Sequence, residues 1–123
     1  ERDALQVVAD QIGAPTPAAW IADASAHVLQ QGVRDSGIWN VVAAGQTSWH
    51  GFAEAIIEQA HALGMLARKP QVLAIPTSAY PTPARRPAYS VLETQALQRD
   101  FGITPPDWRE GLRVTLDALA LRR

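Results

Sequence analysis

The 123-residue sequence contains no cysteine and only one lysine, Lys69. The absence of cysteine excludes disulfides, thiolate nucleophiles and thiolate metal ligands, and it agrees with a reducing, cytoplasmic compartment. A formal net charge of -1 leaves no broad basic surface, so we expect no nucleic acid partner. No apolar run approaches the roughly 20 residues that a membrane helix needs, so we expect no membrane partner either.

The chain opens on Glu1-Arg2-Asp3, without an initiator methionine. The order of basic, apolar and small residues that marks a signal peptide is missing. A charged start directly before a strand-like run predicts that the sequence is a piece of a longer polypeptide.

Two motifs that serve dinucleotide cofactors are also missing. The glycines never lie close together between a strand and a helix, as a phosphate-binding loop requires. A Tyr-x-x-x-Lys pair is absent, because Tyr80 is followed four residues later by Ala84 and Tyr89 by Glu93. We therefore expect no catalytic and no cofactor-binding residues in this chain, and no turnover by the chain alone.

The three histidines do not have the spacing of a metal site. His50 and His61 share roughly one face of a predicted helix, but their separation in sequence corresponds to about 16 Å along the helix axis. His27 belongs to another predicted helix, with no carboxylate placed to complete a site. We predict no bound metal.

Strand and helix patterns alternate along the chain, which predicts an α/β fold. Short β-rich runs cover 5–9, 38–43 and 71–75, and we expect them to form a small sheet of about three short strands. Four helices are predicted, over 17–31, over 48–63, from the segment 90–93 to about 102, and after 104–107. Their starts are assigned to Thr16, to Thr47 or Ser48, to a capping box Ser90-x-x-Glu93 and to the run Thr104-Pro105-Pro106-Asp107.

Aromatic residues follow the apolar positions of these elements. We interpret all four tryptophans as packing residues of the core or of a domain interface: Trp20, Trp39, Trp49 and Trp108. A small sheet also leaves faces that need a partner, which would favour self-association of the isolated chain.

The turn 10–16 is the first candidate binding site, because it carries polar side chains between a strand end and a helix start. Such positions often line ligand crevices in α/β proteins, and a helix N-terminus favours anions. A well-built turn followed by a cap explains the same residues equally well.

The segment 79–90 is the second candidate. Arg85 and Arg86 offer rigid forks of donors suited to phosphate oxygens. Flanking prolines reduce the entropy lost in holding them, and Tyr80 and Tyr89 offer faces for a base or a sugar. A proline-stiffened surface loop with solvated arginines remains the alternative.

Four motifs in a fixed order carry a family resemblance. They are Asp10-Gln11-x-Gly13-Ala14-Pro15-Thr16, then Gly45-x-Thr47-x-Trp49-His50, then Pro76-Thr77-x-x-Tyr80-Pro81-Thr82-Pro83-Ala84-x-Arg86-Pro87-x-x-Ser90-x-Leu92, and Pro106-x-Trp108-x-x-Gly111. Together they resemble the C-terminal, substrate-binding part of the dTDP-4-dehydrorhamnose reductases, which are extended short-chain dehydrogenases/reductases with a Rossmann-type fold. The resemblance covers nearly the whole chain.

The resemblance implies that residues 1–123 form the nucleotide-sugar-binding segment of such an enzyme, with its N-terminal Rossmann cofactor domain outside this chain. The parent enzyme would use NADPH, or NADH, to convert dTDP-4-dehydro-L-rhamnose into dTDP-L-rhamnose for cell-surface polysaccharide. By position, Arg86 would hold the diphosphate, and Gln11 and Gly13 would lie on the sugar side of the cleft. Arg85 and Tyr89 complete the predicted substrate-binding residues, although the family usually has Asn in place of Tyr89.

Two other interpretations stay open. A related nucleotide-sugar reductase or epimerase would share the Arg-Pro loop while acting on another sugar. A non-catalytic binding or regulatory module would keep the fold after the chemistry is lost.

Overall fold

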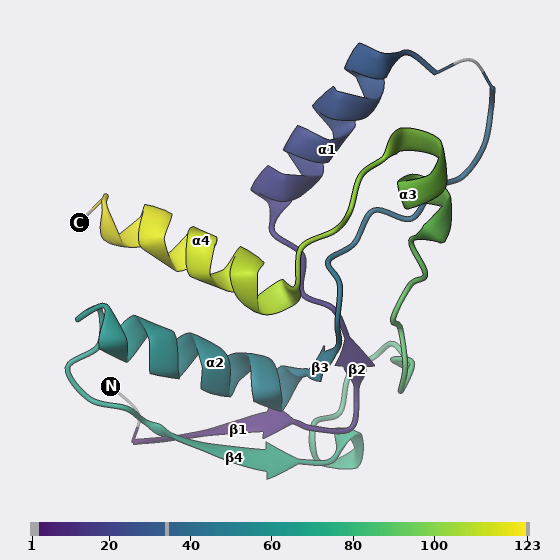
Figure 1. Ribbon diagram of the computed structural model, residues 1–123. Helices are drawn as coiled ribbons and strands as arrows, with labels where there is room; N and C mark the ends of the chain where they lie inside the picture. Colours follow the sequence, from purple (N-terminus) through teal and green to yellow (C-terminus); the bar gives the residue numbers. More distant parts are fainter. Residues whose placement is uncertain (1–2, 34, 123) are drawn as a thin grey trace.

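A computed structural model describes residues 3–33 and 35–122 (Figure 1). In chain order the elements are β1 (Ala4–Val8), β2 (Ile12–Gly13), α1 (Ala18–Gln31), β3 (Thr47–Ser48), α2 (Trp49–Ala62), β4 (Gln71–Ile75), a single 3-10 turn η1 (Thr77–Ala79), α3 (Gln95–Phe101) and α4 (Trp108–Ala120). The α/β class and the four predicted helices are confirmed.

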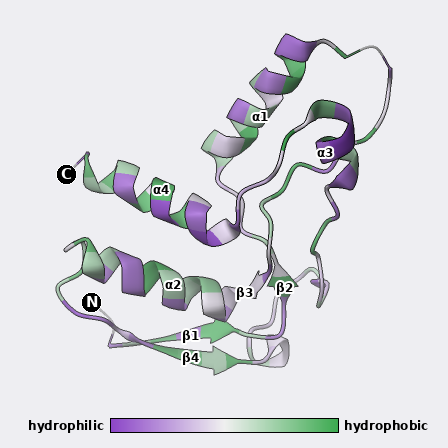
Figure 2. Ribbon diagram, in the orientation of Figure 1, coloured by the Kyte–Doolittle hydropathy of each residue, from purple (hydrophilic) through white to green (hydrophobic). Residues whose placement is uncertain are grey.

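Two short sheets organise the described residues. Strands β1 and β4 pair in parallel, from Ala4 opposite Gln71 to Val8 opposite Ile75. Strands β2 and β3 pair antiparallel at only two positions. Helix α2 lies along the β1–β4 sheet and α4 packs on the other side of α2, while α1 and α3 lie away from this sheet (Figure 1). Both strands of the parallel sheet are coloured as mostly hydrophobic in Figure 2.

The strand predicted over 38–43 does not form. At the end of the run Ala43 N donates to Thr16 Oγ1 at 3.0 Å, and directly after it Ala44 N donates to the Pro106 carbonyl at 2.9 Å. Apolar β-branched composition alone suggested a strand, but a strand also needs a neighbouring ladder. The segment is instead an extended connection that ties the start of α1 to the start of α4.

The main core lies between α2 and α4. Trp108 is 3% exposed, and its ring meets the ring of Phe52 edge-on with centroids 6.1 Å apart. This arrangement is a favourable one for aromatic pairs. The core contains Ala43, Trp108, Leu112 and Leu116, with Phe52, Ala55, Ile56 and Met65 packed against it. The apolar stripe predicted for the last helix is therefore correct at Trp108, Leu112 and Leu116, whereas Leu119 is 45% exposed.

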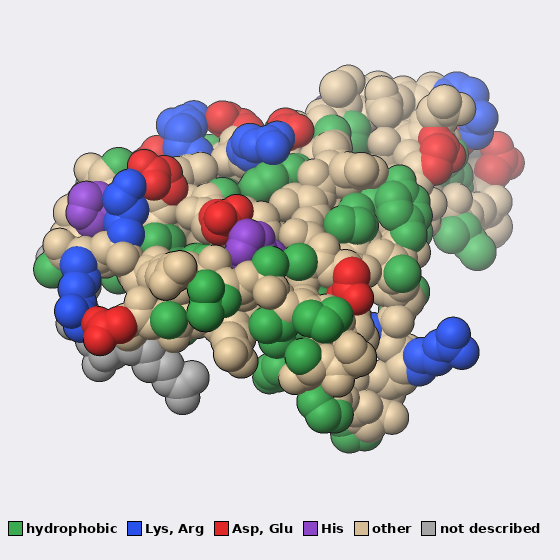
Figure 3. All heavy atoms as spheres, turned by 90° about the horizontal axis from the view of Figure 1, so that it is seen from below, with side chains coloured by type: hydrophobic (Ala, Val, Ile, Leu, Met, Phe, Trp, Pro, Cys, Tyr) green, Lys and Arg blue, Asp and Glu red, His purple; other side chains and the backbone are tan. Residues whose placement is uncertain are grey.

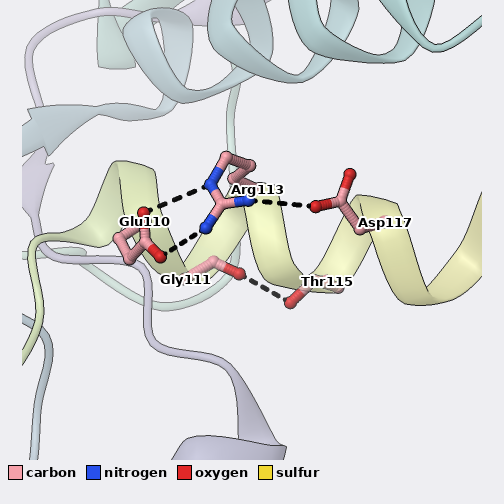
Figure 4. Close-up of polar contacts among 5 residues, drawn as sticks. All are labelled: Glu110, Gly111, Arg113, Thr115 and Asp117. Atoms are coloured by element: carbon pink, nitrogen blue, oxygen red, sulfur yellow. Dashed lines mark hydrogen bonds and ion pairs between the residues drawn. The ribbon is translucent and has the colours of Figure 1, made fainter.

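The outward side of α4 carries a charged row. The guanidinium of Arg113 donates to Glu110 at 2.6 Å and to Asp117 at 3.2 Å, one turn before and one turn after it (Figure 4). All three side chains are largely exposed, so each pair contributes little to stability by itself. The hydrogen bond from Arg113 lowers the pKa of Glu110. Charged residues outside and apolar residues inside fix the orientation of α4 over α2.

Helix starts agree with the sequence in two cases and differ in two. Ser48 Oγ accepts from Gly51 N at the start of α2, and Asp107 Oδ1 accepts from Arg109 N at the start of α4. Thr16 does not cap α1, because Pro17 occupies the N-cap position. The predicted capping box is wrong as well: α3 begins at Gln95, and the hydroxyl of Ser90 donates to the Ile12 carbonyl.

Over 3–33 and 35–122, no helix is long and apolar enough to cross a membrane. The same residues contain no group of three or more His, Asp or Glu side chains that could hold a metal ion.

Candidate functional site

Two adjoining hollows lie where the strand ends meet the start of α2. Their volumes are about 380 Å³ and 530 Å³, and both are lined by Gln11, Trp49 and Arg86. The first hollow is completed by Ile12, Gly13, Ala14, Pro15, Thr47, Ser48, Phe52, Pro87 and Ser90. The second is completed by Gln6, Val7, Val8, Tyr80 and Thr82. Their position beyond the carboxyl ends of parallel strands is the usual place for a ligand crevice in α/β proteins.

Backbone bonds hold the proline-rich segment 76–90 against the turn after β1. Ile12 N donates to the Ala88 carbonyl at 2.8 Å, and Ser90 N donates to the Ile12 carbonyl at 2.9 Å. These bonds flank a parallel bridge between Ile12 and Tyr89. The two candidate sites, far apart in sequence, are therefore one surface.

Gly13 permits this close approach. A Cβ atom at this position would lie 3.1 Å from the hydroxyl oxygen of Ser90. Contacts of that length are tighter than ordinary van der Waals contact, so the Ser90 side chain would have to shift slightly to admit a larger residue. Glycine at this position therefore lets the turn after β1 lie directly against Ser90, at the wall of the first hollow.

A chain of side-chain hydrogen bonds crosses the site. Trp49 Nε1 donates to Gln11 Oε1 at 3.1 Å, and Gln11 Nε2 donates to Thr77 Oγ1 at 3.2 Å. The Thr77 hydroxyl donates to Asp10 Oδ1 at 2.6 Å, and the Thr77 backbone N donates to the same oxygen at 2.8 Å. These bonds from Thr77 lower the pKa of Asp10, because they stabilise the ionised carboxylate. This series of hydrogen bonds joins the turn after β1, the start of α2 and η1.

Arg86 lies at the meeting of the two hollows. Within the described part of the chain its guanidinium forms neither a hydrogen bond nor an ion pair. Several other basic side chains are paired, for example Lys69 with Glu58 at 2.7 Å and Arg68 with Asp3 at 2.8 Å. Figure 3 shows that basic groups on this face commonly lie beside acidic ones. A free guanidinium beside a hollow can bind an anion.

The other two predicted residues do not line these two hollows. Arg85 lines a third, more open hollow, which shares Tyr80, Thr82 and Arg86 with the second. Tyr89 is 60% exposed, and its hydroxyl donates to Gln46 Oε1 at 3.1 Å. The structure thus brings Gln11, Gly13 and Arg86 together and leaves Arg85 and Tyr89 at the rim.

Trp49 is the site residue that the sequence interpretation missed. The sequence predicts packing in the core or at a domain interface; the core assignment is wrong, because Trp49 is 57% exposed and lines both hollows. Its position next to the apolar residues of the predicted helix favoured the packing interpretation. The signal that pointed the other way was its position directly after the cap Ser48, where the first helical turn extends beyond the core.

The residues around the hollows can bind and orient a ligand, but they offer little for catalysis. Neither hollow is lined by histidine, lysine or a carboxylate. His50 lies elsewhere: its Nε2 is 3.2 Å from the Val72 carbonyl and its Nδ1 is 3.5 Å from Glu54. The site has the composition of an anion-binding cleft with an aromatic wall.

Comparisons with known proteins agree with one another. The family model described as the RmlD substrate binding domain matches residues 1–121. The dTDP-4-dehydrorhamnose reductase of Burkholderia thailandensis is 50% identical over 118 residues, which are 89% of this chain and 40% of the relative. The enzyme of that name from Escherichia coli K12 is 39% identical over 122 residues, covering 97% of this chain and 41% of the relative.

Solved structures show the same similarity. The dTDP-4-dehydrorhamnose reductase of Bacillus anthracis in complex with NADP aligns with a TM-score of 0.85 and 30% identity, over 95% of this chain and 39% of that structure. The ortholog from Clostridium acetobutylicum aligns with a TM-score of 0.84 and 30% identity, over 96% of this chain and 39% of that structure. The chain therefore spans about two fifths of the length of these relatives.

Proposed function

We propose that this chain, which belongs to the RmlD substrate binding domain family, is the part of a dTDP-4-dehydrorhamnose reductase that holds the nucleotide sugar. The whole enzyme would reduce the 4-keto group of dTDP-4-dehydro-L-rhamnose to give dTDP-L-rhamnose. The chain would bind the diphosphate, and it would act in the cytoplasm together with a Rossmann cofactor domain.

The observation that carries the proposal is the unpaired guanidinium of Arg86 at the meeting of two hollows. A nucleotide sugar has an anionic centre with a ring system on either side. An anion held at Arg86 would let one ring system extend into each hollow. Arginine suits this task because its planar fork can donate two parallel hydrogen bonds to a phosphate.

The cofactor of the proposed reaction does not fit the residues of this chain. The glycines with positive φ are Gly32, Gly45, Gly64 and Gly102, and they are dispersed over separate loops. No glycine-rich turn between a strand and a helix is available for a pyrophosphate within the described residues. NADPH or NADH would therefore be held by another part of the enzyme; the Bacillus anthracis relative, of which this chain covers 39%, was solved in complex with NADP. The 123-residue chain alone is expected to reduce nothing.

Binding of dTDP to the chain, measured by calorimetry, tests the proposed diphosphate contact at Arg86. Substituting Arg86→Ala removes a charge-assisted contact, and we expect the dissociation constant for dTDP to rise about tenfold or more. The neighbouring Arg85→Ala is the matched control, because Arg85 lines neither of the two hollows. Its effect should stay within about threefold, which is the size expected of an exposed charge that does not touch the ligand.

Two results would contradict the proposal. Equal effects of Arg86→Ala and Arg85→Ala would show that the loop attracts anions only by its overall charge. Reduction of a keto-sugar by the 123-residue chain would show that catalytic groups are present after all.

One relative supports a second candidate substrate. The Bacillus subtilis spore coat polysaccharide biosynthesis protein SpsK is 38% identical over 109 residues, close to the similarity of several named reductases. A related nucleotide-sugar reductase or epimerase would therefore fit the same fold. Assays of the complete enzyme with other nucleotide-linked keto-sugars distinguish the two candidates.

A further inference from the structure

We propose that Trp49 is a ligand contact whose indole face packs against a ring of the nucleotide sugar, next to the diphosphate at Arg86. Asp10, Thr77 and Gln11 are positioning residues that hold the indole in place. This inference rests on the proposed function and deepens it, since it assigns the ring-binding surface of the same site.

The exposure of Trp49 sets it apart from the packed aromatic residues. Trp108 is 3% exposed within the core, and Trp39 packs edge-on against Phe101 with its N–H donated to Asp100. Trp49 is 57% exposed and lines both hollows beside Arg86. A large exposed apolar face beside a free cation is the composition of sites that bind a ring attached to a phosphate.

The hydrogen-bond chain gives the indole one orientation. An ionised Asp10 can only accept, so the Thr77 hydroxyl must donate its proton to the carboxylate. The Thr77 oxygen then accepts from Gln11, which requires the amide nitrogen of Gln11 on that side. The amide oxygen therefore faces Trp49, whose N–H can only donate. Every bond in the chain has a single allowed direction, starting from the carboxylate.

This series of hydrogen bonds assigns Gln11 a different role from the one that the sequence predicts. Both ends of its amide are occupied, one by Thr77 and the other by Trp49. A direct contact to the sugar, as the sequence predicts, would have to compete with these bonds. The geometry supports instead a residue that fixes a neighbouring aromatic ring before the ligand arrives, which reduces the entropy lost on binding.

Three probes with increasing numbers of rings test the role of Trp49: inorganic pyrophosphate, dTDP and dTDP-glucose. We expect Trp49→Ala to leave pyrophosphate binding within about twofold and to weaken at least one ring-bearing probe about tenfold. Trp49→Phe keeps an aromatic face and should recover part of that loss. Trp39→Phe is the matched control, because Trp39 lines neither hollow.

The pattern over the probes identifies the ring. A loss that is already present with dTDP assigns the indole to the thymine base, and a loss seen only with dTDP-glucose assigns it to the hexose. An equal loss for all three probes, or no loss, would overturn the role of Trp49. If Arg86→Ala still weakens dTDP in that case, the proposed function stands; if dTDP does not bind the unsubstituted chain, the proposed function itself fails.

The positioning role has a separate test. Thr77→Val removes the hydroxyl that links Gln11 to Asp10 while keeping a similar shape. We expect it to weaken the ring-bearing probe that Trp49→Ala weakens, by about threefold, without changing pyrophosphate binding. Thr77→Ser restores a hydroxyl and should restore affinity. Loss of affinity in both Thr77 variants, or in neither, would contradict the positioning role.

Discussion

Residues of the same type have different surroundings in this protein, even where they are neighbours in sequence. Arg86 lines both hollows, whereas Arg85, one position earlier, lines only the third, more open hollow. Trp49 and Trp108 differ in the same way, as one is exposed at a hollow and the other is buried in the core. Residue type alone therefore does not determine a role here, because the role depends on which distant segment lies opposite the side chain.

Gly45 gives a prediction at the residue scale. Its φ is +79°, and a Cβ atom there would lie 2.6 Å from Asp107 Oδ2. Gly45→Ala would both strain the backbone and disturb the carboxylate that caps α4. Gly64→Ala is the matched control, since Gly64 also has positive φ but no atom near its missing Cβ.

In urea unfolding we expect Gly64→Ala to lower the free energy of unfolding by about 1 kcal/mol, the cost of a non-glycine residue in the left-handed region. Gly45→Ala should lower it by at least about 1 kcal/mol more, because the capping contact is also lost. Equal losses in the two variants would mean that Asp107 moves aside without cost.

At the scale of elements, local signals identified the helices better than the strands. The N-cap residues Ser48 and Asp107 lie within the helix starts that the sequence predicts, because a capping bond joins residues two or three positions apart. Strands β2 and β3 were not predicted, since each has only two residues and pairs across more than thirty intervening positions. The run 38–43 has strand-like composition but no neighbouring ladder.

The cap of α2 gives a prediction at this scale. Ser48→Ala removes the oxygen that accepts from Gly51 N at 3.0 Å, and we expect the free energy of unfolding to fall by about 1 kcal/mol. Ser25→Ala, in the exposed middle of α1, is the control and should change it by less than about 0.5 kcal/mol. Thermal or urea unfolding followed by circular dichroism measures both, and equal effects would show that the cap contributes nothing.

At the scale of the whole molecule, ionised carboxylates join elements that are distant in sequence. Asp10 binds η1 through Thr77, and Asp100 binds the segment before β3 through the N–H of Trp39. Hydrogen bonds lower the pKa of four carboxyl groups. The main donors are Thr77 for Asp10, Lys69 for Glu58, Arg99 for Asp100 and Arg113 for Glu110.

These lowered pKa values predict how stability depends on pH. A carboxyl group whose pKa is lower in the folded state stabilises the fold above its unfolded value, which is 3.8 for Asp and 4.5 for Glu. Stability should therefore be constant from pH 7 to about 5 and fall as the pH drops through these values. Urea midpoints at pH 7, 5 and 3 measure the effect.

A variant makes the pH prediction specific. Asp100→Asn should be less stable than the unsubstituted chain at pH 7, and the difference should become smaller at pH 3, because the contribution of a carboxyl with a lowered pKa decreases once the pH is below its unfolded value of 3.8. Asp23→Asn is the control, because its carboxylate forms no ion pair or hydrogen bond within the described residues. A difference for Asp100→Asn that is as large at pH 3 as at pH 7 would contradict the role of ionisation.

The sequence by itself determined the α/β class, the four helices, the lack of its own cofactor loop and catalytic pair, and the two segments from which the site is built. Those features depend on periodicity, capping residues and glycine spacing, which act over a few positions. Only the tertiary structure decided that the two segments form one surface, that Arg86 rather than Arg85 lines the hollows, and that Trp49 is exposed there. The physical reason is distance along the chain: the bond between Gln11 and Thr77 joins residues 66 positions apart, and no local pattern records such a contact.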